Sequence, residues 1–281
     1  MKHNLILCVL LALSAISQSN DRPVTIAILA KDKSHTLPLY LMCLEYQTFP
    51  KSNTYLYIRT NNNNDDTEQI LKEWLARVGD QYRGIYFDSS DVKERVQEYG
   101  QHEWNSTRFK VLGRIRQESM DWAYAHGSHY FVIDCDNFIY PQTLDALLEV
   151  NLPIVAPLLY SNNAYSNFHS KIDDNGYHLP CPLYLTILNR DIKGLIELPV
   201  VHCTYLVRYE YLPQMSYDDE SYRYEYVIFS DVARKKGIGQ YLDTRQVYGN
   251  LTLCENTKEL VEESWFPEFT AKLCHYLMIA K

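Results

Sequence analysis

The sequence predicts an α/β fold in which a mostly parallel sheet is flanked by helices. From Val24 to Leu159, short β-branched or aromatic runs alternate with segments of helical periodicity. This alternation is typical of β-α-β units, whose crossover helices cover both faces of a parallel sheet. The hydrophobic content of 46% is ordinary for a globular protein, and no repeat or flexible linker divides the chain. We therefore expect one domain over residues 21–281.

The first half of the chain supplies most of the predicted elements. Strands are expected where β-branched and aromatic residues cluster, over residues 24–30, 54–60, 84–88, 129–136 and 153–159. Helices are expected over residues 39–46, 67–79, 107–126 and 143–150. In the second of these helices one face is apolar and consists of Ile70, Leu71, Trp74, Leu75 and Val78. Asp65 or Asp66 can cap its start, Gly79 can end it, and Gly127 is expected to end the third helix.

The second half is less regular. Between residues 160 and 182 it is rich in Tyr, Asn and Pro, which favours loops that could face an acceptor. After these loops we expect a strand over residues 202–212, a helix over 226–237 closed by Gly237, and a final strand over 238–244. In open parallel sheets, ligands bind at the carboxyl ends of the strands. Ala30, Thr60 and the aspartate pair at residues 134 and 136 should therefore lie along one edge.

Residues 1–20 differ from the rest of the chain. A basic start at Lys2 and His3 precedes an apolar run from Leu5 to Ile16, and small polar residues follow. This is the layout of a secretory signal peptide, and the apolar run is shorter than the roughly 20 residues that a membrane span needs. We expect a protein without a membrane span in the endoplasmic reticulum lumen or outside the cell. A retained signal anchor is the alternative.

Composition supports this interpretation and limits the partners. The chain has seven cysteines without a C-x-x-C pair, and an oxidising compartment favours one or two disulfides besides buried thiols. Sequons at Asn105 and Asn250 are compatible with a glycoprotein. The net charge of −8, with no basic run, argues against nucleic acid as a partner.

Two carboxylates follow the apolar run His129–Ile133. Asp134 and Asp136 are separated by one residue, so their side chains would point to the same side of an extended strand. Such a pair suits Mg²⁺ or Mn²⁺, which proteins often hold with one or two carboxylates plus substrate phosphates. A D-x-D at the edge of a sheet would therefore fit a nucleotide diphosphate. Alternatively, Asp134 is a cap and Asp136 a solvated turn residue.

Other chemical motifs are weaker. The sequence has no Walker loop, no G-x-G-x-x-G, no G-x-S-x-G and no H-E-x-x-H, which argues against kinases, nicotinamide enzymes, serine hydrolases and zincins. His202 is expected to be a buried, hydrogen-bonded histidine. Glu225 stands among three tyrosines; it is either a solvated acid or, in an aromatic pocket, a general base with a raised pKa.

Several collinear stretches resemble the N-terminal domain of the procollagen galactosyltransferase family, which includes the cerebral endothelial cell adhesion molecule. They are HTLPLYLMCLE, DDTEQILKEWL, STRFKVLGRIRQ, YFVIDCDNFIYPQTL, VAPLLYSNNAYSNF and VVHCTYLV. The resemblance implies a GT-A fold with a D-x-D metal site. It also implies inverting transfer of galactose from UDP-galactose to hydroxylysine of collagen-like proteins, aided by Mn²⁺.

The resemblance also suggests roles for individual residues. Asp134 and Asp136 match the family D-x-D as metal ligands, with Asp134 also toward the nucleotide and Asn137 extending the motif. Glu225 matches an acidic position and is the candidate base. The remaining nucleotide-binding candidates are Ala30, Lys31, Asn61, Asn63, Arg114 and Arg116, although the two arginines could equally form a structural helix face.

Two departures from the family pattern leave a second hypothesis open. Val247 stands where the resemblance implies a histidine, which would be a natural metal ligand, and Asn61 stands where it implies an aspartate. The chain is then either an active, metal-dependent hexosyltransferase or an inactive domain with a binding or adhesion role. The choice between galactose and glucose stays open, since it depends on the orientation of one hydroxyl.

Overall fold

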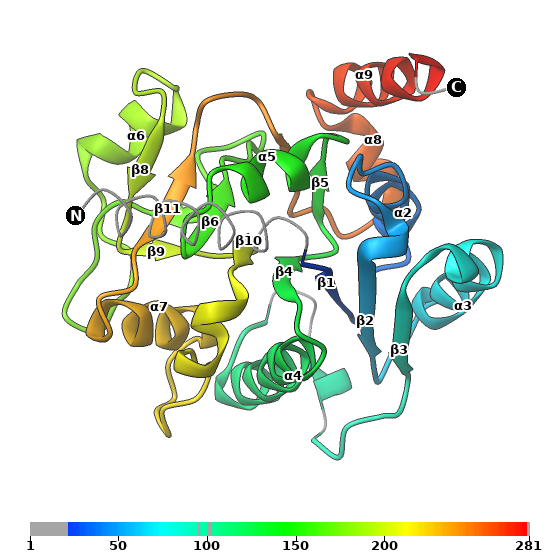
Figure 1. Ribbon diagram of the computed structural model, residues 1–281, viewed down its shortest axis with the longest axis horizontal. Coiled ribbons are helices and arrows are strands. Elements are labelled where there is room, and N and C mark those ends of the chain that lie inside the picture. The colour runs from blue at the N-terminus through cyan, green and yellow to red at the C-terminus, as the bar shows by residue number, and fades with distance from the viewer. Residues whose placement is uncertain (1–21, 95, 100–102, 280–281) are drawn as a thin grey trace, which may run out of the picture.

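An eight-stranded sheet runs through the centre of the computed structural model, which describes residues 22–94, 96–99 and 103–279 (Figure 1). In spatial order its strands are β3 (Gly84–Asp88), β2 (Thr54–Thr60), β1 (Val24–Ala30), β4 (His129–Ile133), β10 (Thr204–Val207), β6 (Ile154–Pro157), β11 (Gln240–Asp243) and β8 (Leu195–Glu197). The first four are mutually parallel, as are β6 and β11. Strands β10 and β8 run antiparallel to their neighbours. The predicted mostly parallel α/β sheet is confirmed.

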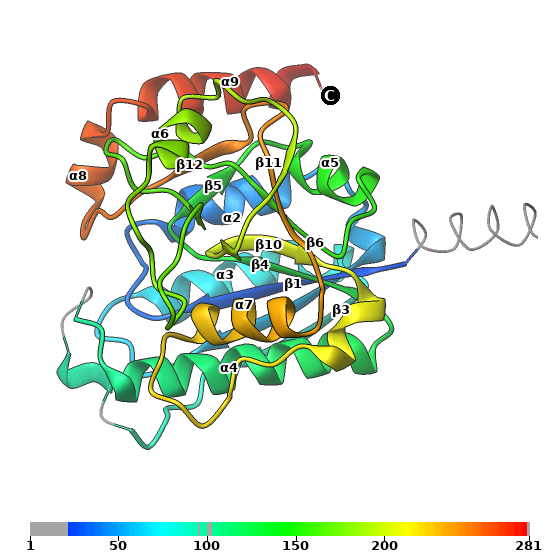
Figure 2. The same cartoon turned by 90° about the vertical axis from the view of Figure 1, so that its left-hand side faces the viewer.

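Helices cover both faces of this sheet (Figure 2). The helices are α2 (Leu37–Glu45), α3 (Thr67–Val78), α4 (Ser106–Ala125), α5 (Thr143–Glu149), α6 (Pro182–Leu188), α7 (Glu225–Lys235), α8 (Thr257–Glu262) and α9 (Phe266–Ile279). One large core cluster joins β1, β2 and β4 to α2, α3 and α5, and a second joins the opposite face of the sheet to α4 and α7. Because both faces are covered, the central strands are almost entirely buried.

The predicted elements of the first half match closely. Strands β1, β2 and β3 begin and end where the sequence places them. Gly127 and Gly237 end their helices with φ of 65° and 67°, the left-handed conformation that glycine adopts without steric cost. Gly79 also ends its helix as predicted, at the C-cap of α3, but with a φ of −61°, and the chain continues into a 3₁₀ turn. Asp65 rather than Asp66 caps the start of α3, since its carboxylate accepts from Thr67 N at 3.0 Å.

Four expectations are corrected, one at the 129–136 strand of the first half and three in the second half. The strand predicted over residues 129–136 ends at Ile133, so the aspartates lie in the turn after it. Of the strand predicted over residues 202–212, only Thr204–Val207 forms. A 3₁₀ segment follows, because its backbone hydrogen bonds are made within the segment. The strand over 238–244 is not the last, because β12 (Gly249–Leu251) pairs with β5 (Asn137–Ile139). Two short strands in the loop region, β7 (Phe168–His169) and β9 (Val200–Val201), also pair.

Other expectations concern the thiols, the sequons and the first residues. The cysteines of the described chain are all free, so the expected disulfides are absent there; they sit on separate elements, such as Cys43 in α2 and Cys274 in α9. Asn250 is 9% exposed, which makes its sequon inaccessible in the folded chain.

The predicted signal peptide, residues 1–20, lies outside the described residues. Within those residues, no helix is long and apolar enough to cross a membrane.

Candidate functional site

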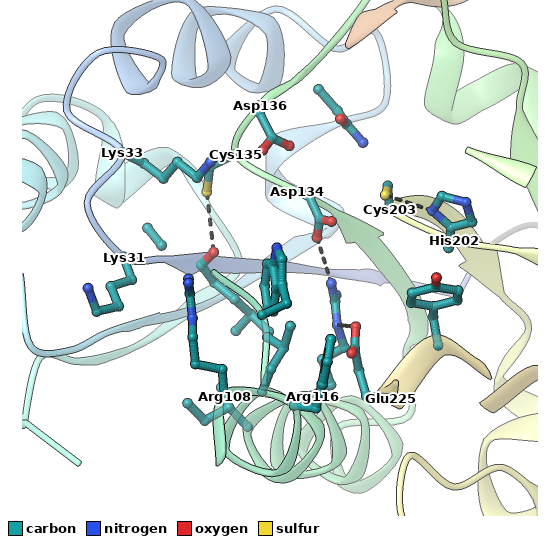
Figure 3. Close-up of a pocket in the computed structure, with 18 of the residues that line it drawn as sticks. Lys31, Lys33, Arg108, Arg116, Asp134, Cys135, Asp136, His202, Cys203 and Glu225 are labelled. Carbon is teal, nitrogen blue, oxygen red and sulfur yellow. Dashed lines mark hydrogen bonds and ion pairs between the residues drawn. The ribbon is translucent and has the colours of Figure 1, made fainter. Parts of the chain in front are cut away.

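A cavity of about 420 Å³ opens at the carboxyl ends of β1, β2 and β4. This is the edge at which parallel sheets bind ligands, and the sequence predicted that Ala30 and the 134–136 turn would meet there. We call one side the cationic wall, and it consists of Ala30, Lys31, Lys33, Arg59, Asn61 and Arg108. We call the other side the aromatic wall, and it consists of Tyr165, His202, Cys203, Tyr224, Glu225 and Tyr226. Arg116, Asp134 and Asp136 lie between the two (Figure 3).

The loop after β1 is held by the loop after β2. Asp32 N donates to Asn63 Oδ1 at 3.0 Å, and Lys33 N donates to Thr67 Oγ1 at 2.7 Å. Asp32 has a φ of 52°, which turns the chain sharply at the cavity edge. Of the predicted nucleotide residues here, Ala30, Lys31 and Asn61 line the cavity. Asn63 instead supports the loop, because its amide is engaged by Asp32 and by Thr60.

The two aspartates occupy the turn between β4 and β5. Asp134 N donates to Cys203 O at 2.9 Å, and Asp136 O accepts from Thr252 N at 3.0 Å, so neighbouring segments fix the backbone of the turn. Their side chains are 29% and 24% exposed, toward the cavity. Asn137, which was expected to extend the motif, directs its amide to Thr204 Oγ1 at 2.7 Å and is 2% exposed.

Arg116 connects the aspartate pair to the candidate base. Its Nη2 lies 2.7 Å from Asp134 Oδ1, and its Nε lies 3.4 Å from Glu225 Oε1, which is an ion-pair contact without a hydrogen bond. Burial raises the pKa of Asp134 and of Glu225, and the nearby Arg116 guanidinium offsets part of that effect. Glu225 is 4% exposed and begins α7, where the helix dipole stabilises a negative charge. The three side chains form a row in which the buried Arg116 cation lies between the carboxylates of Asp134 and Glu225.

Close packing of two helices sets the position of Glu225. A Cβ added at Gly113 of α4 would lie 3.1 Å from Tyr217 O and 3.3 Å from Glu225 Cβ. Any larger side chain at residue 113 would press on the start of α7. The sequence shows this glycine within a predicted helix but gives no sign of the contact.

The two arginines predicted on α4 point to different parts of the molecule. Arg116 points into the cavity, whereas Arg114 forms a bidentate pair with Glu94, at 2.8 Å for the shorter contact, and borders a different hollow. Arg108 lines the main cavity, although the sequence analysis did not select it. Arg108, Leu112 and Arg116 recur every four residues on one helix face, and that spacing could have singled out Arg108. Lys33 was also missed, because nothing local marks it.

His202 is a buried part of the aromatic wall, as expected. It is 2% exposed, and its Nδ1 lies 2.8 Å from Cys203 Sγ. Its Nε2 has no hydrogen-bond partner among the described residues. Burial, together with His169 and Arg116, holds the pKa of His202 well below its usual range, so the ring is neutral at pH 7. The Tyr226 ring lies 4.8 Å from it.

The site fits a divalent cation only together with a ligand. Asp134 and Asp136 each use one oxygen for an arginine or lysine, which leaves the other for a cation. Across the described ranges, no group of three His, Cys, Asp or Glu side chains could hold a metal ion. Val247 is 40% exposed and does not line the cavity. Two carboxylates completed by phosphate and water oxygens are a usual Mg²⁺ or Mn²⁺ set.

Comparison with known proteins identifies the family to which the chain is similar. Residues 22–266 match the N-terminal domain of glycosyltransferase family 25. Human procollagen galactosyltransferase 2 is 33% identical over 250 residues, which are 85% of this chain and 40% of that protein. Human inactive glycosyltransferase 25 family member 3 is 30% identical over 260 residues, 89% of this chain and 44% of that protein. The chain thus spans about two-fifths of the length of these relatives.

Solved structures support the fold. GalNAc-T7 with UDP, GalNAc and Mn²⁺ aligns with a TM-score of 0.54 at 11% identity, covering 90% of this chain and 50% of that one. S. aureus TarS, residues 1–349, aligns with a TM-score of 0.53 at 14% identity, covering 82% and 60%. At such low identities the likeness shows the fold alone. The fold of these structures is that of the GT-A glycosyltransferases.

Proposed function

Because the chain belongs to glycosyltransferase family 25, we propose that it transfers a hexose from a UDP-sugar, and that the donor is UDP-galactose and the acceptor hydroxylysine of a collagen-like protein. The observation that carries the proposal is the cavity itself. It brings a D-x-D pair, several cationic side chains and one buried glutamate to the carboxyl edge of a parallel sheet. That combination suits a diphosphate leaving group and a reaction that removes one proton.

On the donor side, the cationic wall would bind the nucleotide. Ala30, Lys31 and Asn61 border the space that we assign to uridine, and Arg116 lies beside the aspartates where the diphosphate would sit. Asp134 and Asp136 would hold Mn²⁺ or Mg²⁺, which would stabilise the negative charge on the departing phosphate. Arg116 contacts both neighbouring carboxylates, which holds them in position.

On the acceptor side, Glu225 would take the proton of the attacking hydroxyl. An inverting transfer is a single displacement, so one base facing the sugar is sufficient. Burial raises the pKa of Glu225, which makes it a better proton acceptor, and the nearby Arg116 guanidinium offsets part of that rise. The neutral His202 and the tyrosines beside it would border the sugar and the acceptor.

An inactive binding domain is the second candidate, and two observations favour it. Several similar proteins are named inactive glycosyltransferase 25 family members. The described residues also contain no third protein donor for a metal. Such a domain would keep nucleotide binding and lose transfer.

A transfer assay separates the two functions. The chain is incubated with UDP-galactose or UDP-glucose, Mn²⁺ and a collagen peptide that contains hydroxylysine, and the peptide is analysed by mass spectrometry. The proposal expects one added hexose with UDP-galactose and less with UDP-glucose. UDP binding without product from either donor would support the binding domain instead.

The proposal includes a location in the endoplasmic reticulum lumen or outside the cell, supported by the signal-like pattern of residues 1–20. Protease protection of microsomes that carry the newly synthesised chain tests it. Protection that is lost on adding detergent is expected, and digestion in intact microsomes would contradict it.

A further inference from the structure

Lys33 places an ammonium group on one of the two carboxylates that would hold a cation (Figure 3). Its Nζ lies 2.9 Å from Asp136 Oδ2, and the two side chains are 20% and 24% exposed. A lysine side chain carries an ammonium at neutral pH, and here that group points into the cavity.

The backbone holds Lys33 in this position independently of Asp136. Its N–H donates to Thr67 Oγ1, at the start of α3, and the next residue, Ser34, donates to Asp65 Oδ2 at 2.9 Å. The loop is thus tied, on both sides of the lysine Cα, to Thr67 at the start of α3 and to Asp65 just before it. These bonds fix the Lys33 backbone beside the cavity, and the side chain reaches Asp136 from there.

The charges in the cavity already come close to balance. The lining holds five cationic side chains, namely Lys31, Lys33, Arg59, Arg108 and Arg116, and four carboxylates, namely Asp32, Asp134, Asp136 and Glu225. Each aspartate of the D-x-D has its own protein cation at 2.7 to 2.9 Å. A divalent cation arriving at Asp136 would meet the ammonium as a like charge, which disfavours its binding.

We propose that Lys33 supplies part of the positive charge that a divalent cation would otherwise bring, so that a nucleoside diphosphate binds here with little dependence on Mn²⁺ or Mg²⁺. An ammonium on a flexible four-carbon stem can keep its contact with Asp136 and donate a second hydrogen bond to a phosphate oxygen. The inference rests on the proposed function, because it concerns the same nucleotide site.

Calorimetric titration of the full chain with UDP tests the inference, once in excess EDTA and once in saturating Mn²⁺. Lys33→Met removes the charge and keeps most of the side-chain volume, while Lys33→Arg keeps the charge. Lys72→Met, which removes an exposed lysine of α3 paired with Glu68, is the matched control. Circular dichroism and thermal melting establish that each variant is folded.

The unmodified chain is expected to bind UDP in EDTA within about threefold of its affinity in Mn²⁺. Lys33→Met should lose about tenfold or more in EDTA, and Mn²⁺ should restore much of that loss, since a hydrogen bond to a charged group is replaced by the metal. Lys33→Arg should retain most of the affinity in EDTA, and Lys72→Met should behave like the unmodified chain.

Two results would overturn the inference, and they differ in what else they affect. UDP binding only in Mn²⁺, with Lys33→Met unchanged, would reject the role of Lys33 and leave the proposed function standing. No UDP binding under either condition would reject the proposed function and this inference together.

Discussion

The cationic wall and the aromatic wall face the same cavity but carry different kinds of side chain. The cationic wall holds four lysines and arginines, with Lys31 and Lys33 on the loop after β1, Arg59 in β2 and Arg108 in α4. The aromatic wall holds tyrosines and a neutral histidine around a single carboxylate, Glu225. The first composition suits phosphates and the second suits an uncharged sugar or acceptor, so the two ends of a transferase substrate can be assigned by charge alone.

The largest expected effect comes from breaking the link between the walls. Arg116→Ala would leave Asp134 and Glu225 without their shared cation, and removing one partner of a buried ion pair typically costs about 3–5 kcal/mol of stability. Urea denaturation measures this. Arg114→Ala, two residues away and exposed, should cost about 1 kcal/mol or less. Equal losses for both variants would contradict the central place of Arg116.

The next effect separates the walls by function. Glu225→Gln keeps the size of the side chain and removes the base, so the transfer rate should fall by about 10²–10⁴-fold. UDP affinity should change little, because the nucleotide is assigned to the opposite wall. Steady-state kinetics together with UDP titration measure both quantities. Unchanged turnover would rule out Glu225 as the base.

His169, whose ring packs against His202 and Tyr226 of the aromatic wall, should respond to acid. Burial and His178 lower the pKa of His169 to about 4, below the 6.5 of an unperturbed histidine. The folded state therefore resists protonation of His169. The stability that the neutral ring contributes is complete above pH 6.5 and declines as the pH falls toward 4. For His169, 7% exposed, the loss between pH 7 and pH 5 is about 2 kcal/mol.

His169→Gln should reduce this loss, and urea denaturation at pH 7 and pH 5 provides the comparison. An equal pH dependence with and without His169 would show that another group is responsible. The ring centres of His169 and His202 lie 5.2 Å apart. A variant with Gln at both positions should therefore show an even weaker dependence of stability on pH.

A smaller effect is expected where the walls meet helix α4. Gly113→Ala adds one methyl group against Tyr217 O and Glu225, and overpacking of this kind costs about 1–3 kcal/mol. The shift at Glu225 should lower turnover more than it changes UDP affinity. If the melting temperature and the turnover are both unchanged, α4 and α7 can move apart without a loss of stability, which would contradict this expectation.

The two walls also differ in how well the sequence predicts them. Ala30, Asn61 and the aspartate turn follow β-branched strands of a regular β-α-β pattern, so their meeting at one edge follows from strand direction. Tyr165 and His202 come from the irregular region around β7 and β9, where antiparallel β10 is inserted between parallel strands. Local periodicity carries no information about such non-local pairing.

Single residues show the same limit. Lys33 resembles any loop lysine in the sequence, and only the fold brings it to Asp136, 103 residues away. Arg114 and Arg116 are two residues apart in α4, so they must face different sides of the helix, but the sequence does not show which of them reaches the cavity. Family resemblance pointed to the aspartates, Glu225 and Arg116, but not to the contacts by which Arg116 joins Asp134 to Glu225.

Hydrogen–deuterium exchange with and without saturating UDP tests most directly whether the cationic wall binds the nucleotide. We expect slower exchange in the loop over residues 31–36 and in the first turns of α4, with little change over residues 160–182. Protection confined to residues 160–182, or absent from 31–36 while UDP binds, would contradict the assignment of the two walls.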